Sequence, residues 1–219
     1  MIAVVDYGRG NLGSVEKAFV RLGLDAIVTQ DPGAVRSAEA LVLPGDGAFH
    51  DAMTSLDRLG LLAPIKECLE TERPFLGICL GYQLLFSESE EFGRGKGLDV
   101  IPGVVRRFPS GRRAVGPQGE WALKVPHMGW NRVMHSGDLA IFDGIPSGAY
   151  FYFVHSYYPQ PVDGTLRVAT CQYGVTFPAA IGRGNIFGAQ FHPEKSQLWG
   201  LKLLENFARV VKAPLRRSA

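Results

Sequence analysis

Apolar residues in the first 90 positions alternate between short continuous runs and helical spacing. The continuous runs predict strands over residues 2–6, 25–29, 40–43 and 75–79. Helical spacing follows the first run, at Leu12, Val15, Phe19 and Leu22, and precedes the last, at Leu56, Leu59, Leu62, Ile65 and Leu69. Continuous apolar strands that alternate with helices predict a parallel sheet covered on both faces, and therefore an α/β fold.

The second half of the chain has a different pattern. A polar stretch at 87–91 is followed by segments rich in β-branched and aromatic residues, such as 150–158 and 166–173, which predict antiparallel strands and hairpins. An amphipathic helix over 198–211 and a frayed tail from Pro214 end the chain. We therefore expect a mostly parallel central sheet flanked by helices, with an additional antiparallel β section in the C-terminal half.

Composition and charge narrow the class of protein. The chain has 219 residues, of which 46% are hydrophobic and 20% charged, with a net charge of +2. These values predict one globular, soluble domain over residues 1–219 and argue against a dedicated nucleic-acid binder. With no basic leader and no apolar run of about 18 residues, we expect neither a signal peptide nor a membrane span. Three cysteines favour a reducing compartment, and hence the cytoplasm.

The first candidate for chemistry is the stretch Gly77-Ile78-Cys79-Leu80-Gly81, between an apolar strand and the helical run 82–86. This is the pattern of a nucleophile elbow with cysteine as the nucleophile, because flanking glycines remove the Cβ atoms that would collide in so tight a turn. A helix N-terminus also favours thiolate over thiol, and the Leu80 N–H is a candidate oxyanion donor. The alternative is a buried cysteine at a strand end.

A partner motif, Gln190-Phe191-His192-Pro193-Glu194, follows the apolar run 186–189. Pro193 disfavours the helical region for His192, so we expect an extended segment in which His192 and Glu194 share one side. The carboxylate can then orient an imidazole that takes the thiol proton and returns a proton to a leaving group, an effect worth roughly 10²–10⁴ in rate. Alone, the motif is more often a loop histidine beside an incidental acid. The cysteine elbow upstream favours the catalytic interpretation.

A third element, Leu43-Pro44-Gly45-Asp46-Gly47, ends a predicted strand. Glycines there let a peptide N–H turn toward a substrate, so Gly45, Asp46 and Gly47 are candidates for a second oxyanion donor. Loss of one such donor typically costs on the order of 10²–10³ in turnover. A plain turn between a strand and a helix fits the same residues.

Together, the elbow with Gln83, the 44–47 turn and His192-Pro193-Glu194 resemble class I glutamine amidotransferases. Within that class, stretches 6–12, 127–131, 152–157 and 192–197 resemble the glutaminase subunits of imidazole glycerol phosphate synthases. The resemblance implies a flavodoxin-like amidotransferase fold without a cofactor, and hydrolysis of L-glutamine at a Cys79–His192–Glu194 triad. One departure is Asp46, where the family usually has a small apolar residue.

The resemblance also implies roles for further residues. Four match positions that hold glutamine, with Glu91 suited to the α-ammonium group: Gln83, Glu91, Ser156 and Tyr157. Four match positions that face a partner: Asn11, Trp130, Tyr152 and Lys195. The implied partner in the heterodimer is a cyclase subunit of (β/α)₈-barrel fold that uses the ammonia in histidine biosynthesis.

Two other functions fit parts of the sequence. Gly8, Gly10 and Gly13 form a G-x-G-x-x-G pattern with Asp31 beyond a second predicted strand, as in dinucleotide-binding oxidoreductases. That interpretation leaves the elbow and the His-Pro-Glu motif unexplained. A non-catalytic interaction protein is suggested by basic pairs at 106–107, 112–113 and 216–217, which are usually solvated surface. The histidines lack the spacing of a zinc site, so we expect no metal.

Overall fold

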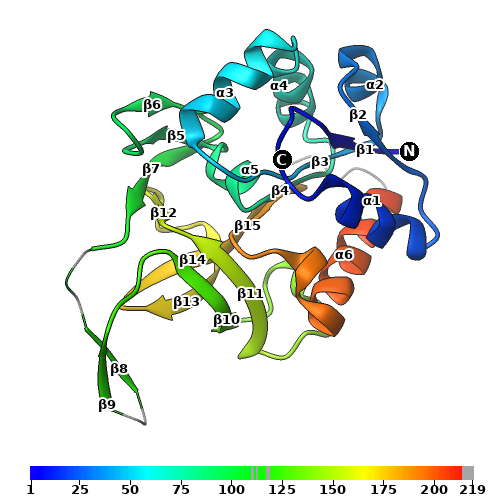
Figure 1. The fold of residues 1–219 in the computed structure, drawn as a ribbon. Helices are drawn as coiled ribbons and strands as arrows, with labels where there is room; N and C mark the ends of the chain where they lie inside the picture. Colours follow the sequence, from blue (N-terminus) through cyan, green and yellow to red (C-terminus); the bar gives the residue numbers. More distant parts are fainter. Residues whose placement is uncertain (110, 112, 117–118, 214–219) are drawn as a thin grey trace.

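The computed structural model describes residues 1–109, 111, 113–116 and 119–213. Its central sheet has the strand order β13-β14-β15-β4-β3-β1-β2 (Figure 1). The strands that run parallel are β15 (Ile186–Ala189), β4 (Phe75–Ile78), β3 (Ala40–Leu43), β1 (Ile2–Val5) and β2 (Ala26–Thr29). Antiparallel strands β14 (Val175–Arg183) and β13 (Arg167–Tyr173) extend the sheet at the β15 edge. The predicted fold class is confirmed.

Helices cover both faces of this sheet. One face carries α1 (Leu12–Arg21) and α6 (Gln197–Lys212), and the other carries α2 (Pro32–Ser37), α3 (Phe49–Arg58) and α4 (Leu62–Glu70) (Figure 1). Successive strand residues point to opposite faces, so Val4 joins the hydrophobic cluster under α1 and α6, while Val5 joins the other cluster. Burial on both faces explains why the parallel strands are continuous apolar runs rather than alternating ones.

The antiparallel β section lies beside the carboxyl ends of the parallel strands. A second sheet has the order β12-β7-β5-β6, and β10 (His127–Val133) pairs with β11 (Ala149–His155). The remaining bounds are β5 (Phe86–Ser89), β6 (Gly95–Lys96), β7 (Ile101–Arg107), β12 (Tyr157–Pro161), the pair β8 (Arg113–Gly116) and β9 (Gly119–Ala122), and the short 3₁₀ helices η1 (Ala140–Phe142) and η2 (Pro193–Lys195). One pair, β5 with β7, is parallel within this otherwise antiparallel section.

Two predicted helices were wrong in extent. The helical spacing over 56–69 belongs to two helices, α3 and α4, because Gly60 lies between them with a φ of +69° that an α-helix cannot contain. The run 82–86 is not one helix either, since α5 spans only Leu80–Gln83 and Phe86 begins β5. Residues 84–86 are all buried, and a fully apolar run has no periodicity that separates helix from strand. The tail from Pro214 and the pair 216–217 lie outside the described residues, as do the side chains at 112–113.

The contact between α6 and the sheet yields a stability prediction. Phe207 is fully buried, with its ring 6.1 Å from that of Phe19 and 6.4 Å from that of Phe187. Phe207→Ala leaves a cavity between α6, α1 and β15, so we expect a loss of about 3–5 kcal/mol in the free energy of unfolding. Val20→Ala on the exposed face of α1 is the control, with a change within about 0.5 kcal/mol. Urea denaturation of the two variants measures both, and equal stabilities would contradict this packing.

Candidate active site

Cys79 lies at a sharp corner between β4 and α5. Its φ of 55° and ψ of −108° are strained for a residue with a side chain, and such strain is concentrated at functional sites. The Cys79 N–H donates to the Ala189 carbonyl at 2.7 Å, which anchors the end of β4 to β15. Gly81 permits the turn, because a Cβ atom there would overlap the Leu43 carbonyl oxygen. The chain therefore holds the Cys79 thiol at the carboxyl edge of the sheet.

His192 and Glu194 lie next to this corner, where β15 leaves the sheet. The Nδ1 of His192 is 2.9 Å from Oε1 of Glu194, whose side chain is only 1% exposed. The Cys79 thiol lies beside the imidazole, in the wall of the same cavity. Burial by itself would lower the pKa of His192, but the adjacent sulfur and the Glu194 carboxylate raise that pKa to about 10. The surroundings of His192 thus favour its protonated form.

The local backbone at Glu194 differs from the expectation. His192 is extended, with φ of −98° and ψ of 97°, but Pro193–Lys195 forms η2 instead of continuing the extended segment. The turn brings the Glu194 carboxylate back toward the imidazole. The Lys195 N–H donates to the His192 carbonyl at 3.1 Å and closes the turn.

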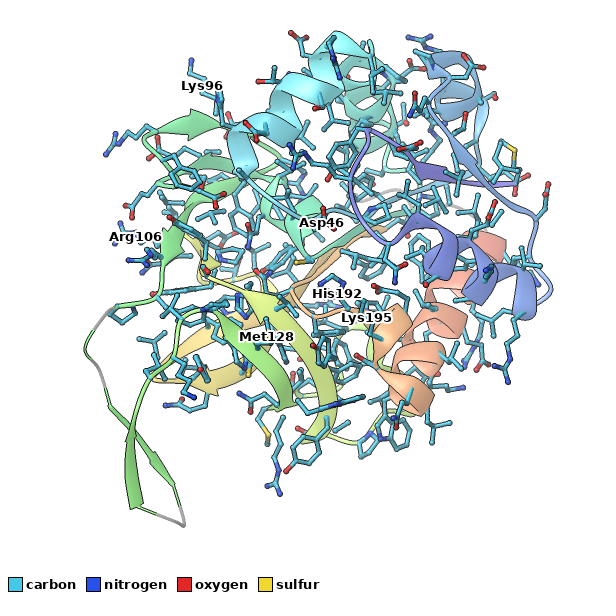
Figure 2. The ribbon with its side chains drawn as sticks, viewed as in Figure 1. Asp46, Lys96, Arg106, Met128, His192 and Lys195 are labelled. Carbon is cyan, nitrogen blue, oxygen red and sulfur yellow. The ribbon has the colours of Figure 1, made fainter. Side chains whose placement is uncertain are left out.

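A cavity of about 370 Å³ opens over Cys79 and His192. Eleven of the predicted site residues line it: Asn11, Asp46, Gly47, Cys79, Leu80, Gln83, Glu91, Ser156, Tyr157, His192 and Lys195. Figure 2 labels three of these residues, Asp46, His192 and Lys195. A cavity of this size accommodates a small molecule such as an amino acid.

The other predicted residues lie outside the cavity wall. Gly45 is buried behind the turn, and Glu194 lies behind His192. Trp130 on β10 is 46% exposed, and its ring packs edge-on against that of Tyr152, with centroids 5.9 Å apart. The predicted partner positions are thus divided between the cavity wall, with Asn11 and Lys195, and the adjoining surface, with Trp130 and Tyr152.

One of the candidate oxyanion donors, the Leu80 N–H, is engaged in this conformation. The Leu80 N–H points at the Gly45 carbonyl oxygen, with N and O 3.4 Å apart. The Tyr7 hydroxyl lies against Gly45, so close that a Cβ atom at Gly45 would overlap it. Burial raises the pKa of Tyr7, and its hydroxyl has no hydrogen-bond partner among the described residues. Gly45 is therefore packed tightly between Tyr7 and Leu80, whereas Asp46 and Gly47 are exposed.

The side chains beside the nucleophile form a connected polar group. Nε2 of Gln83 donates to the Tyr157 carbonyl at 2.9 Å and to Oε1 of Gln190 at 3.0 Å. Nε2 of Gln190 lies 3.8 Å from the Cys79 sulfur. The Oε2 of Glu91 accepts from the Phe49 N–H at 2.7 Å and caps α3, and its Oε1 has no hydrogen bond to the part of the chain that the structure describes. Burial raises the pKa of Glu91.

Sequence reasoning missed two residues in this region, Gln190 and Tyr7. Both stood in motifs that the sequence analysis quoted, and the signal for Gln190 was a polar residue directly after a buried apolar strand. Gln190 is fully buried, and a buried amide needs partners, which here are Gln83 and the Cys79 sulfur. Tyr7 gave no such signal, because tyrosine packs equally well in a core.

The features that suggested other functions have structural roles here. Asp31 caps α2, with its two carboxylate oxygens accepting from the Gly33 and Ala34 N–H groups at 3.0 and 3.2 Å. Gly10 packs against Gly45, where a Cβ atom would lie 3.2 Å from the Gly45 nitrogen. Arg106 forms an ion pair with Glu90. In the part of the chain that the structure describes, no cluster of three or more His, Cys, Asp and Glu could hold a metal, and no helix is long and apolar enough to cross a membrane.

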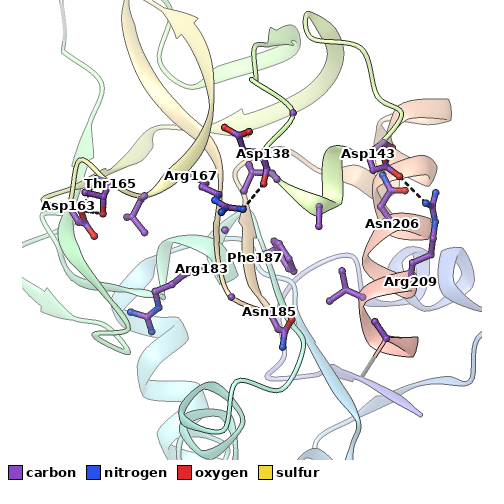
Figure 3. Close-up of a pocket in the computed structure, with 18 residues that line it drawn as sticks. Asp138, Asp143, Asp163, Thr165, Arg167, Arg183, Asn185, Phe187, Asn206 and Arg209 are labelled. Carbon is purple, nitrogen blue, oxygen red and sulfur yellow. Dashed lines mark hydrogen bonds and ion pairs between the residues drawn. The ribbon is translucent and has the colours of Figure 1, made fainter. Parts of the chain in front are cut away.

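A larger cavity, of about 830 Å³, lies at the opposite end of the central strands from Cys79, near the start of β15 (Figure 3). Its charged side chains are largely engaged with the protein itself. Arg209 pairs with Asp143 at 3.0 Å, and Arg167 donates to the Asp138 carbonyl at 3.2 Å. None of the predicted site residues lines this cavity. The larger of the two cavities is therefore not the candidate active site.

The comparison with protein families agrees with this geometry. The family described as glutamine amidotransferase class-I matches residues 3–211. The chain belongs to the class I glutamine amidotransferase family. It is therefore an enzyme, as the sequence predicted.

Individual relatives of this amidotransferase narrow the assignment. It is 54% identical over 207 residues to the imidazole glycerol phosphate synthase subunit HisH of Syntrophotalea carbinolica, covering 94% of this chain and 98% of that protein. It is 52% identical to the HisH subunit of Moorella thermoacetica, over 96% and 95% of the two chains. The predicted resemblance to these glutaminase subunits is confirmed. A crystal structure of a glutamine amidotransferase has the same fold, with a TM-score of 0.73 at 17% identity over 97% of this chain and 100% of that one.

The amidotransferase site predicts selective labelling at one cysteine. Burial raises the pKa values of Cys68 and Cys171 to about 12, so both stay as unreactive thiols, whereas Cys79 lines the open cavity. A glutamine-like electrophile such as a diazoketone should therefore modify Cys79 alone, as read by peptide mass spectrometry. Cys79→Ala should remove both the label and glutamine hydrolysis, while Cys171→Ala keeps both. A label on Cys68 or Cys171 would refute the assignment.

The hydrogen bonds of the triad predict a ranking of two variants. His192→Ala removes the group that must move protons, so we expect glutamine turnover to fall by roughly 10²–10⁴. Glu194→Gln keeps a hydrogen-bonding side chain near Nδ1 but loses the negative charge, so a measurable fraction of turnover should remain. Steady-state kinetics of both variants makes the comparison. Higher turnover in His192→Ala than in Glu194→Gln would mean that the roles of the two residues are misassigned.

Proposed function

We propose that the chain hydrolyses L-glutamine to glutamate and ammonia through a thioester on Cys79. The observation that supports this most directly is that the Cys79 thiol and the His192 imidazole line one cavity, with the imidazole hydrogen-bonded to the buried Glu194 carboxylate. With Nδ1 of His192 bonded to Glu194, Nε2 is the nitrogen left for the thiol. Its position at the wall of a 370 Å³ cavity lets it reach a bound amide.

The proposed reaction has two balanced halves. In the first, His192 takes the Cys79 proton, the sulfur bonds to the carboxamide carbon, and the C–N bond breaks as ammonia leaves with a proton from His192. In the second, His192 takes a proton from water, the hydroxide attacks the thioester, and the C–S bond breaks as the sulfur takes the proton back from His192 and glutamate forms. Glu194 stabilises the imidazolium in both halves and stays ionised.

Glutamine is held, in this proposal, by the residues around the nucleophile. Glu91 has one carboxylate oxygen committed to capping α3, which leaves the other for the α-ammonium group. Ser156 and Tyr157 form the facing wall, and the Gln83 side chain is fixed by two hydrogen bonds. These contacts would fix the amide carbon above the sulfur.

The oxyanion turn is the element that we propose to be switched. An oxyanion on the thioester-forming carbon needs the Leu80 N–H, which here faces the Gly45 carbonyl at 3.4 Å. Rotation of the Gly45–Asp46 peptide would release the Leu80 N–H and present the Asp46 N–H as a second donor. The displaced Gly45 carbonyl could then accept from the buried Tyr7 hydroxyl beside it. The conformation described here is thus a silent one.

We propose that the partner is the cyclase subunit of imidazole glycerol phosphate synthase, to which the ammonia passes for the synthesis of imidazole glycerol phosphate and aminoimidazole carboxamide ribotide. The names of the HisH relatives support a place in that synthase. The surface around Trp130 and Met128 supports a docking face, because these side chains are 46% and 62% exposed. Residues 1–219 would act there as one domain in the cytoplasm.

A short covalent and hydrogen-bonded path joins that surface to the triad. The His192 N–H donates to the Tyr152 carbonyl at 2.9 Å, and the Tyr152 N–H donates to the Ser196 hydroxyl at 3.0 Å. The same hydroxyl donates to the His192 carbonyl at 2.6 Å. A partner that moves β11 or η2 would therefore move His192 directly.

This proposal predicts an order of activities. Glutamine turnover should rise from the isolated chain to the complex with the cyclase subunit, and again when the nucleotide ligand of the cyclase is bound. The increase should be in kcat rather than in KM, because the released donors act on the transition state. Coupled glutamate detection measures all three states. Full activity of the isolated chain would contradict the switch while leaving the triad intact.

A further inference from the structure

A line of buried polar side chains runs from β10 toward the glutamine side of the cavity. His127 on β10 and His155 on β11 are 3% and 6% exposed, and His127 Nδ1 lies 2.9 Å from His155 Nε2. At one end, His155 Nδ1 lies 2.8 Å from the Tyr157 carbonyl oxygen. At the other, Nδ2 of Asn131 lies 3.2 Å from His127 Nε2. The mechanism described above does not use either histidine.

Because the line ends at the Tyr157 carbonyl oxygen, the direction of every hydrogen bond in it is fixed. A carbonyl oxygen can only accept, so His155 must carry its proton on Nδ1. Nε2 of a neutral His155 is then an acceptor, which requires His127 to donate from Nδ1. His127 Nε2 is left as an acceptor for the Asn131 amide. One arrangement of protons therefore satisfies all four residues, and it requires both rings to be neutral.

The surroundings of the two rings favour the neutral forms. Burial lowers the pKa of His127 to about 4. Burial, followed by the nearness of His127, lowers the pKa of His155 to about 3, even though the Tyr157 carbonyl favours its protonated form. The rings lie within an aromatic cluster, with His127 stacked on Tyr173 at 3.9 Å between centroids and on Phe153 at 4.7 Å.

The Tyr157 carbonyl is where this line meets the glutamine site. Its oxygen accepts from His155 Nδ1 and from Gln83 Nε2, at 2.8 and 2.9 Å, so both of its lone pairs are used. Gln83 continues through Gln190 to within 3.8 Å of the Cys79 sulfur. Removal of the histidine donor would free one lone pair and loosen both Tyr157 and Gln83.

We propose that His127 and His155, aligned by Asn131, are positioning residues that hold the glutamine-binding segment around Tyr157 and Gln83. This rests on the proposed glutaminase function. The held groups bind the substrate alike in the ground state and the transition state, so their loss raises KM and leaves kcat nearly unchanged. Asn131 adjoins the exposed Trp130, so the line also links the docking face to the binding segment.

The first test uses the enzyme with its cyclase partner and ligand. In the double variant His127→Phe/His155→Phe, aromatic packing is kept and both polar partners are removed together, which limits the cost in stability. We expect KM for glutamine to rise roughly tenfold with kcat within about twofold. His135→Phe is the matched control, since the His135 ring lies against Phe142 and its two ring nitrogens have no hydrogen-bond partner among the described residues. Its KM should not change.

The outcomes separate this inference from the proposed function. An unchanged KM in a folded double variant would overturn the positioning role, whereas retained hydrolysis in Cys79→Ala would overturn the function itself. If the double variant fails to fold, ¹⁵N NMR of the unaltered protein tests the hydrogen-bond line instead, because it reports the protonation state and tautomer of each histidine. At pH 7 two histidines should be neutral with the proton on Nδ1. Imidazolium or Nε2–H signals for His127 or His155 would refute the hydrogen-bond line.

Discussion

The turn of the chain at Cys79 is the constraint on which the rest of the site depends. A cysteine at φ 55° costs of order 1–3 kcal/mol, so it persists only where neighbouring structure holds it. Here β15 accepts its N–H on one side, and β3 approaches so closely on the other that only glycine fits at position 81. The parallel sheet thus supplies the rigidity that presents a thiol at its edge.

The same close packing explains why the Leu80 N–H is already hydrogen-bonded, although the side chains of Cys79, His192 and Glu194 lie together. Strands β3 and β4 are neighbours, so the turn after β3 lies directly above the turn after β4. Leu80 at the start of α5 consequently meets Gly45 rather than solvent. A carbonyl in that place satisfies a buried N–H in the absence of substrate. In the proposed switch, activity requires the Leu80 N–H to exchange this acceptor for the substrate oxyanion, which a rotation of the Gly45–Asp46 peptide would achieve.

The antiparallel section gives the site its connection to the surface. Strands β10 and β11 present exposed side chains such as Met128 and Trp130 outward, while their inward residues include His127 and His155. Because neighbouring residues of one strand point to opposite faces, the predicted docking surface and the polar line behind the glutamine site are one residue apart. Displacement of these strands would therefore be felt at Tyr157 and at His192.

Much of this arrangement could be predicted from the sequence, and the limits have physical reasons. The strand predicted over 40–43 matched the structure because residues buried on both faces leave a continuous apolar signal. The split at Gly60 was missed because the helical spacing of apolar residues continues across it, and an isolated glycine is tolerated inside a helix. The shortness of α5 could not be predicted, since periodicity does not mark where an apolar run changes from helix to strand. The catalytic candidates were found through local motifs. Gln190 and the histidine pair were not assigned, because their roles depend on partners far away in the chain.

The most direct measurement is a crystal structure of the chain bound to its cyclase partner, with a glutamine-derived electrophile attached. We expect a covalent bond between the Cys79 sulfur and the electrophile, with the adduct oxygen within hydrogen-bonding distance of the Leu80 and Asp46 N–H groups. The Gly45 carbonyl should then point away from Leu80. An adduct oxygen that points elsewhere while the Gly45 carbonyl still faces the Leu80 N–H would contradict the account.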